Sequence, residues 1–87
     1  MADDTDTPPD ELTIALRKPV KVGDETITSL TLSEPTAAQW LLWSDLDGLE
    51  ADIKAVSVVA GVPEAAVRQI GASELRKAST YLAYFLA

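Results

Sequence analysis

The sequence predicts a small α+β protein, in which an N-terminal antiparallel β-hairpin precedes about four packed α-helices. Two observations predict this fold. Residues 12–32 alternate between apolar and polar side chains around a Gly-Asp pair, which is typical of two half-buried strands joined by a tight turn. After Pro35 the apolar residues instead recur every three or four positions, which indicates amphipathic helices. We therefore expect residues 12–87 to form a single domain.

The hairpin is expected over residues 12–32, with its turn at Gly23-Asp24. Glycine tolerates the positive φ that two-residue hairpin turns need. With this turn, Val20 and Leu30 point to opposite faces of the hairpin, although both are apolar. One extra residue near Pro19, or opposite it, would bring them to the same face. Because proline cannot donate to a strand ladder, we expect a β-bulge at this place.

Four helical segments are expected after the hairpin, over about residues 35–47, 50–60, 63–70 and 73–86. Pro35 and Pro63 suit the first turn of a helix, where the missing N–H costs nothing. Gly48 and Gly61 are expected to end the first two helices. The stripe that the last helix buries is expected to consist of Leu75, Ala78, Leu82 and Phe85.

Composition argues against an enzyme. The 87 residues include no cysteine and no histidine, so the chain can form no disulfide or thiolate metal site and lacks the usual general base. A chain of this length also has little room for a catalytic cleft beside its core. We expect no catalytic residue, no cofactor and no metal site. No apolar run is long enough to span a bilayer, and no secretory leader is recognisable, so we expect a cytoplasmic protein without membrane contact.

One acidic segment resembles a calcium-binding loop. It starts at Asp45 and runs through Asp47, Glu50 and Asp52. In a calcium loop that starts at Asp45, glycine would occupy the position of Glu50, and a bidentate glutamate that of Val56. The spacing therefore indicates a solvated acidic helix end.

Acidic residues are concentrated at the N-terminus. The net charge is −7, and the first eleven residues include Asp3, Asp4, Asp6, Asp10 and Glu11 but no basic residue. Because residues 1–11 have almost nothing apolar to bury, we expect a disordered, solvated tail. The alternative is a tail that meets a basic partner or mimics nucleic acid.

Large apolar and aromatic residues are concentrated in the expected first and last helices. Two interpretations are open: these residues form the core, or part of them stays exposed as a binding site for a partner. Both tyrosines of the last helix are expected at the rim of the core, with their hydroxyls in water. The candidate partner-binding residues are Trp40, Leu42, Trp43, Tyr81, Tyr84 and Phe85.

Residues 55–70 resemble the helix-turn-helix of bacterial repressors, with the turn at Ala60-Gly61-Val62 and Val67 packing the second helix. Non-specific DNA affinity comes from neutralising phosphates. The second helix offers only Arg68 against Glu64, in a chain of net negative charge. We therefore expect a structural helix-turn-helix that binds no nucleic acid. A small DNA-binding regulator is the alternative function.

A wider resemblance covers residues 12–86. It rests on a strand with Lys18-Pro19, a glycine turn, the run Leu-Thr-Leu-Ser-Glu-Pro-Thr over residues 30–36, an apolar-Gly-Val-Pro joint and a Leu- and Phe-rich last helix. In these features the chain resembles the small tail assembly proteins of long-tailed bacteriophages, in particular the Mu-like tail assembly chaperone family. That family often carries an aspartate at the start of the last helix, where Glu74 stands here.

The resemblance implies a chaperone that acts in the host cytoplasm. Such proteins coat the tape measure protein and keep it soluble before the tail tube polymerises around it. The implied partners are the tape measure protein and, as further candidates, the tail tube protein and a second copy of the chain; no enzyme activity and no cofactor are implied. Exposed apolar residues would cover the client, and acidic charge would keep the complex soluble.

Overall fold

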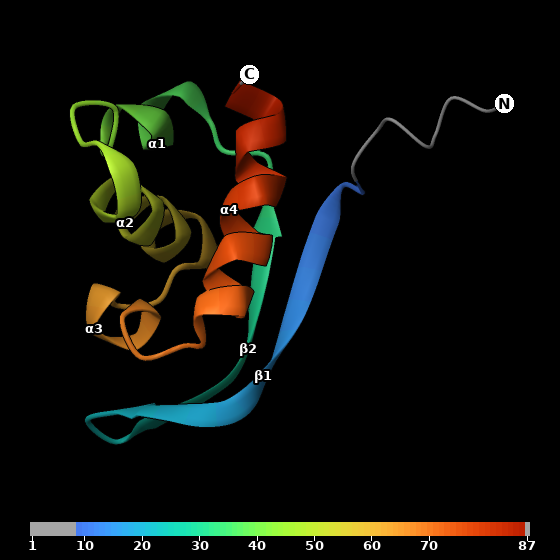
Figure 1. Cartoon of the computed structure of the whole chain (residues 1–87), viewed down its shortest axis with the longest axis vertical. Coiled ribbons are helices and arrows are strands. Elements are labelled where there is room, and N and C mark those ends of the chain that lie inside the picture. Colours follow the sequence, from blue (N-terminus) through green and yellow to red (C-terminus); the bar gives the residue numbers. More distant parts are fainter. Residues whose placement is uncertain (1–8, 87) are drawn as a thin grey trace, which may run out of the picture.

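The structure, a computed structural model that describes residues 9–86, pairs one hairpin with a layer of helices (Figure 1). Strands β1 (Glu11–Val22) and β2 (Glu25–Ser33) are antiparallel. Helices α1 (Ala37–Leu41), α2 (Gly48–Ala60), α3 (Glu64–Val67) and α4 (Ala72–Leu86) follow. In Figure 1, β1 is the outer strand, and α1 lies at the same end of the molecule as the C-terminal end of α4. The predicted α+β architecture is confirmed.

The hairpin turns at Gly23-Asp24, as predicted, and Gly23 adopts a φ of 61°. Near the turn, Val20 lies opposite Ile27, whereas farther along the strands Ala15 lies opposite Ser29. Residues 16–19 of β1 therefore face a single residue of β2, which confirms the bulge predicted near Pro19 and shows that it is larger than one residue.

The bulge places the apolar residues of both strands on one face. It inserts an odd number of extra residues into β1, and side chains alternate with a period of two, so the inward side changes across it. One face of the hairpin thus becomes continuously apolar. Its buried residues are Ile14, Val20, Ile27, Leu30 and Leu32.

The first helix is much shorter than the predicted segment 35–47. Thr36 caps it: its hydroxyl accepts from the Gln39 N–H at 3.1 Å, and the Gln39 side-chain oxygen accepts from the Thr36 N–H at 2.9 Å, a capping box. Beyond Leu41 the backbone hydrogen bonds join residues three apart instead of four, and the Trp43 N–H donates to the carbonyl of Trp40 at 3.1 Å. These tighter turns end the α-helix and direct the Trp43 side chain into the core.

The other helices follow the predicted order with shifted ends. Gly48 begins α2 instead of ending the first helix, and Gly61 ends α2 with a left-handed φ of 73°, as expected for a glycine after a helix. Helix α3 covers only Glu64–Val67 of the predicted segment 63–70, and α4 begins at Ala72. None of the helices formed by residues 9–86 is both long and apolar enough to cross a membrane.

One hydrophobic cluster joins the inner face of the hairpin to α2, α3 and α4. Its most deeply buried large side chains come from β2, α2 and α3: Leu30, Leu32, Val56 and Val67. In the stripe predicted for α4, Ala78 and Leu82 are buried, whereas Leu75 and Phe85 are half-buried. The core is thus sandwiched between the hairpin and the helices.

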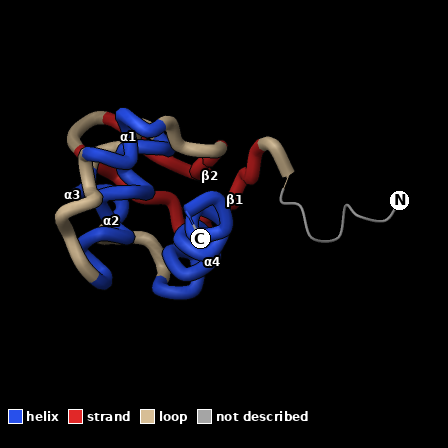
Figure 2. Tube along the Cα trace, turned by 90° about the horizontal axis from the view of Figure 1, so that it is seen from above, coloured by secondary structure: helices blue, strands red, loops and turns tan. Residues whose placement is uncertain are grey.

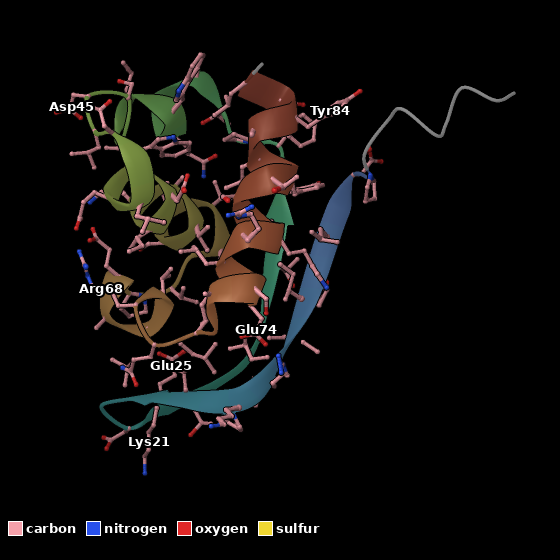
Figure 3. All side chains as sticks on the ribbon, in the orientation of Figure 1. Lys21, Glu25, Asp45, Arg68, Glu74 and Tyr84 are labelled. Atoms are coloured by element: carbon pink, nitrogen blue, oxygen red, sulfur yellow. The ribbon has the colours of Figure 1, made fainter. Side chains whose placement is uncertain are left out.

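A buried carboxylate links the bulge to the last helix. Glu74 accepts a hydrogen bond from the Arg17 N–H at 2.7 Å and another from the Gly71 N–H at 2.9 Å. These two bonds hold the pKa of Glu74 below its usual value. Figure 3 shows Glu74 at the base of α4, facing the hairpin. Glu74 is therefore a structural tie between two elements that are distant in the sequence.

The tail predicted for residues 1–11 lies mostly outside the described residues, which begin at residue 9. Glu11 already belongs to β1. The carbonyl of Pro9 accepts a hydrogen bond of 2.7 Å from the hydroxyl of Tyr81 on α4. The end of the predicted tail is thus fixed against the last helix.

Candidate protein-binding surface

Large apolar side chains are exposed at one corner of the molecule, formed by α1, the turn after it and the first turn of α2. We call this corner the α1–α2 surface. It consists of Trp40, Leu41, Leu42, Leu46 and Leu49, with exposed fractions of 44%, 73%, 55%, 38% and 68%. Among the other described residues, only Tyr84 is a large hydrophobic residue with comparable exposure.

Trp43 explains why its neighbours are exposed. Its side chain is almost completely buried in the core. Successive residues of a helical turn point about 100° apart, so anchoring Trp43 inward turns Leu41 and Leu42 toward solvent. In Figure 2, which shows the molecule from above, α1 lies at the outer edge of the helix layer. The exposure of Leu41 and Leu42 therefore follows from the packing of one tryptophan.

A shallow apolar hollow of about 370 Å³ lies on α1. Its lining residues are Ala37, Trp40, Leu41 and Ser44. Ala37, Trp40 and Leu41 are spaced at i, i+3 and i+4, which places them on one side of α1. The turn after Leu41 continues this path, because the Ser44 hydroxyl donates to the carbonyl of Leu41 at 3.4 Å.

The charged residues of this corner are acidic. No lysine or arginine occurs between Lys21 and Lys54. Asp45, Asp47 and Glu50 are exposed next to the leucines, and Figure 3 shows Asp45 at this corner. Glu50 accepts from Arg68 at 3.1 Å, whereas neither aspartate takes part in an ion pair with any residue the structure describes. The apolar surface therefore has a negative rim.

Comparison with known proteins assigns the chain to a family. Residues 13–87 match the family described as phage tail assembly chaperone proteins, E, or 41 or 14. The chain belongs to this family of phage tail assembly chaperones. The resemblance seen in the sequence is thereby confirmed. Neither a curated protein nor a solved structure gives a significant match.

In this tail assembly chaperone, the six predicted contact residues do not lie together. Trp40 and Leu42 belong to the α1–α2 surface. Trp43 and Tyr81 lie in the core, with exposed fractions of 5% and 7%, so neither is available at the surface. Leu41, Leu46 and Leu49 are exposed residues that the sequence does not single out, because only tertiary packing shows that Trp43 points inward and they do not.

Tyr84 and Phe85 form a separate aromatic group on α4. Their rings meet edge to face, with centroids 5.6 Å apart. Tyr84 is exposed and Phe85 is half-buried. Figure 3 shows Tyr84 directed away from the corner that contains Asp45. The chaperone therefore presents two separate candidate contact areas.

The rim position predicted for Tyr81 is wrong. Its ring packs edge to face on Phe85, with centroids 5.3 Å apart, and its hydroxyl donates a hydrogen bond to the Pro9 carbonyl. Burial, together with the negative charges of Asp10, Glu11 and Glu34, raises the pKa of the Tyr81 hydroxyl. Tyr81 holds the start of β1 against α4.

The helix-turn-helix segment of the chaperone is a packing unit. Its second helix, α3, has only four residues. Arg68, directly after α3, contacts carboxylate oxygens of Glu50 at 3.1 Å and of Glu64 at 3.9 Å. Lys54 also pairs with Glu64, at 3.0 Å. Because carboxylates already surround these cations, the segment offers little to DNA phosphates, and the absence of nucleic-acid binding stays a prediction.

A larger hollow, of about 560 Å³, lies between the bulge and the start of α4. Its lining residues are Arg17, Lys18, Gln69, Ile70, Gly71 and Glu74. The Glu74 carboxylate is occupied by its two backbone hydrogen bonds, and the lining provides no nucleophile paired with a base. Across residues 9–86, no three potential metal-ligating side chains lie close enough to hold an ion.

Proposed function

We propose that this tail assembly chaperone binds the tape measure protein through its α1–α2 surface and keeps it soluble until the tail tube forms. One observation carries the proposal: five exposed large apolar residues lie within residues 40–49. On a small protein, exposed apolar residues gathered in one area mark a contact site. The family assignment makes a tail protein the expected partner.

The proposed activity is binding rather than catalysis. A long helical client that waits for its tube exposes apolar surface, and contact with the chaperone removes part of that surface from water. Each square ångström of apolar area removed from water contributes about 25 cal/mol of favourable free energy, from which the cost of association is subtracted. The net charge of −7 then keeps the complex soluble by repulsion between complexes. We place this activity in the host cytoplasm, where tails assemble.

Two further contacts belong to the proposal. Tyr84 and Phe85 provide a second contact area, on α4. It binds another part of the same client or the tail tube protein. A second copy of the chain is the remaining candidate partner, because adjacent chaperones on one client would meet. These contacts are separable from the α1–α2 surface by substitution, since Tyr84 faces away from it (Figure 3).

Co-expression with the tape measure protein of the same phage tests the proposal. We expect the chaperone to raise the soluble fraction of the client and to co-purify with it. Trp40→Ala and Leu41→Ala should lower the soluble fraction of the client and the amount that co-purifies several-fold, because they remove exposed apolar area without disturbing the core. Lys21→Ala, at the tip of the hairpin, is the matched surface control and should change nothing.

The other outcomes identify what would be wrong. A tape measure protein that is equally soluble without the chaperone contradicts the proposed client. If the client needs the chaperone but only Tyr84→Ala weakens the complex, the contact lies on α4. If Leu41→Ala changes sedimentation of the chaperone alone, the α1–α2 surface joins two copies of this chain.

A further inference from the structure

We propose that the segment bound by the α1–α2 surface is an amphipathic helix with lysine or arginine residues beside its apolar stripe. For the identity of the client, this inference rests on the proposed function. It adds the chemical character of the bound segment. Two independent features of the surface lead to it, the shape of the hollow on α1 and the sign of the charges around the leucines.

The shape favours a helix. The hollow is bordered by Ala37, Trp40 and Leu41 on one side of α1 and by Ser44 in the turn that follows, and an apolar hollow on a helix accepts a side chain from a facing amphipathic helix. Ala37 and Ser44 are small, so the hollow stays open between the larger Trp40 and Leu41. An extended segment would instead bind to an open strand edge, and this corner consists of α1, the turn after it and the first turn of α2.

The charges favour a basic segment. Asp45 and Asp47 are exposed beside the leucines and have no cationic partner within residues 9–86. A partner that covers the leucines also brings its own flanking residues close to these carboxylates. Acidic flanks would be repelled, and uncharged flanks would remove water from the carboxylates without replacing it. Lysine or arginine flanks form ion pairs with Asp45 and Asp47.

The two features have different consequences for binding. Buried apolar side chains supply most of the affinity of an interface, whereas charges at its rim mainly set selectivity and association rate. An exposed ion pair strengthens binding by about 1.4- to 5-fold. With Asp45 and Asp47 both paired, we expect a basic helix to bind about tenfold more tightly than an acidic helix with the same apolar stripe.

Two synthetic helical peptides with the same leucine stripe test the inference, one flanked by lysine and arginine and the other by glutamate. Each is titrated into the full chain, and tryptophan fluorescence reports binding because Trp40 is partly exposed at this surface. We expect the basic peptide to bind about tenfold more tightly, and the difference to shrink at 1 M NaCl, where the Debye length is about 3 Å.

Matched variants separate local from overall charge. Asp45→Asn with Asp47→Asn should remove most of the preference for the basic peptide. Asp24→Asn with Glu25→Gln removes the same number of charges at the hairpin tip and should leave the preference intact. Leu41→Ala should weaken the binding of both peptides. A basic peptide with a scrambled leucine stripe should bind much more weakly than the intact one.

Several results would overturn the inference. These are equal binding of the two peptides, an equal loss of preference in both double variants, and unchanged binding when the leucine stripe is scrambled. The proposed function fails on separate evidence, namely co-expression in which the tape measure protein does not depend on the chaperone. A client held through Leu41, together with peptides that bind alike, would leave the function standing and refute the basic helix.

Discussion

The core face of the hairpin and the α1–α2 surface both consist of large apolar side chains, yet one is covered and the other is open. Leu30 and Leu32 are 1% and 0% exposed, whereas Leu41 and Leu49 are 73% and 68% exposed. The first pair is enclosed by the hairpin and the helices, while no element of the described chain packs over the second pair. Apolar content alone therefore does not distinguish core from contact surface; the position of the neighbouring elements does.

The largest effect is expected from Leu30→Ala, in the covered region. It should lower the free energy of unfolding by about 2–5 kcal/mol, because it removes a fully buried side chain and leaves a cavity. Urea denaturation followed by circular dichroism measures this loss. A loss below about 1 kcal/mol would mean that the hairpin does not pack on the helices as described.

Glu74→Gln should have the next largest effect, because it weakens the tie between the bulge and α4. The pKa of Glu74 is lowered in the folded chain, so its ionised form stabilises the fold at pH values above the usual carboxyl pKa. That stabilisation disappears as pH falls through the lowered pKa.

Thermal unfolding of the wild type and the Glu74→Gln variant between pH 7 and pH 2 tests the tie. We expect a gap in melting temperature that is widest near neutral pH and closes in acid. A gap of constant size across this range would show that the charge of Glu74 is not involved.

Tyr81→Phe should cost about 0.5–1.5 kcal/mol, the usual net contribution of one hydrogen bond. The ring stays buried, and only the bond from its hydroxyl to the carbonyl of Pro9 is lost. Amide exchange should then accelerate at the first residues of β1 and stay unchanged in α2. Unchanged exchange at the start of β1 would contradict the anchoring role of Tyr81.

Leu41→Ala should have the smallest effect on stability, within about 0.5 kcal/mol, because the side chain is mostly in solvent. Its effect on client binding should be large. The contrast with Leu30→Ala separates the two regions: one variant loses folding, and the other keeps folding and loses the partner. A large loss of stability in Leu41→Ala, measured by the same urea titration, would place this residue in the core.

The parts of the fold that depend on local chemistry could be predicted from the sequence. The turn at Gly23-Asp24 follows from the preference of such turns for glycine, and the bulge near Pro19 follows from the missing N–H of proline and the mismatch of apolar faces. The parts that depend on distant contacts could not. The hydrogen bond from Tyr81 to Pro9 joins residues 72 positions apart, and no local sequence pattern predicts it.

The candidate contact surface was predicted only in part for the same reason. Trp40 and Leu42 could be chosen because large apolar residues are conspicuous in a small acidic chain. Trp43 could not be separated from Trp40, since both lie in one apolar run and only tertiary packing buries one of them. The short α1 has the same origin, because tight turns after Leu41 bring Trp43 inward.

Hydrogen exchange of the chaperone, alone and in complex with the tape measure protein, tests the central claim most directly. If the α1–α2 surface covers the client, exchange should slow over residues 37–49 on binding and stay unchanged at the hairpin tip, residues 22–26. Slower exchange confined to the hairpin or to the C-terminal end of α4, with residues 37–49 unaffected, would contradict the claim.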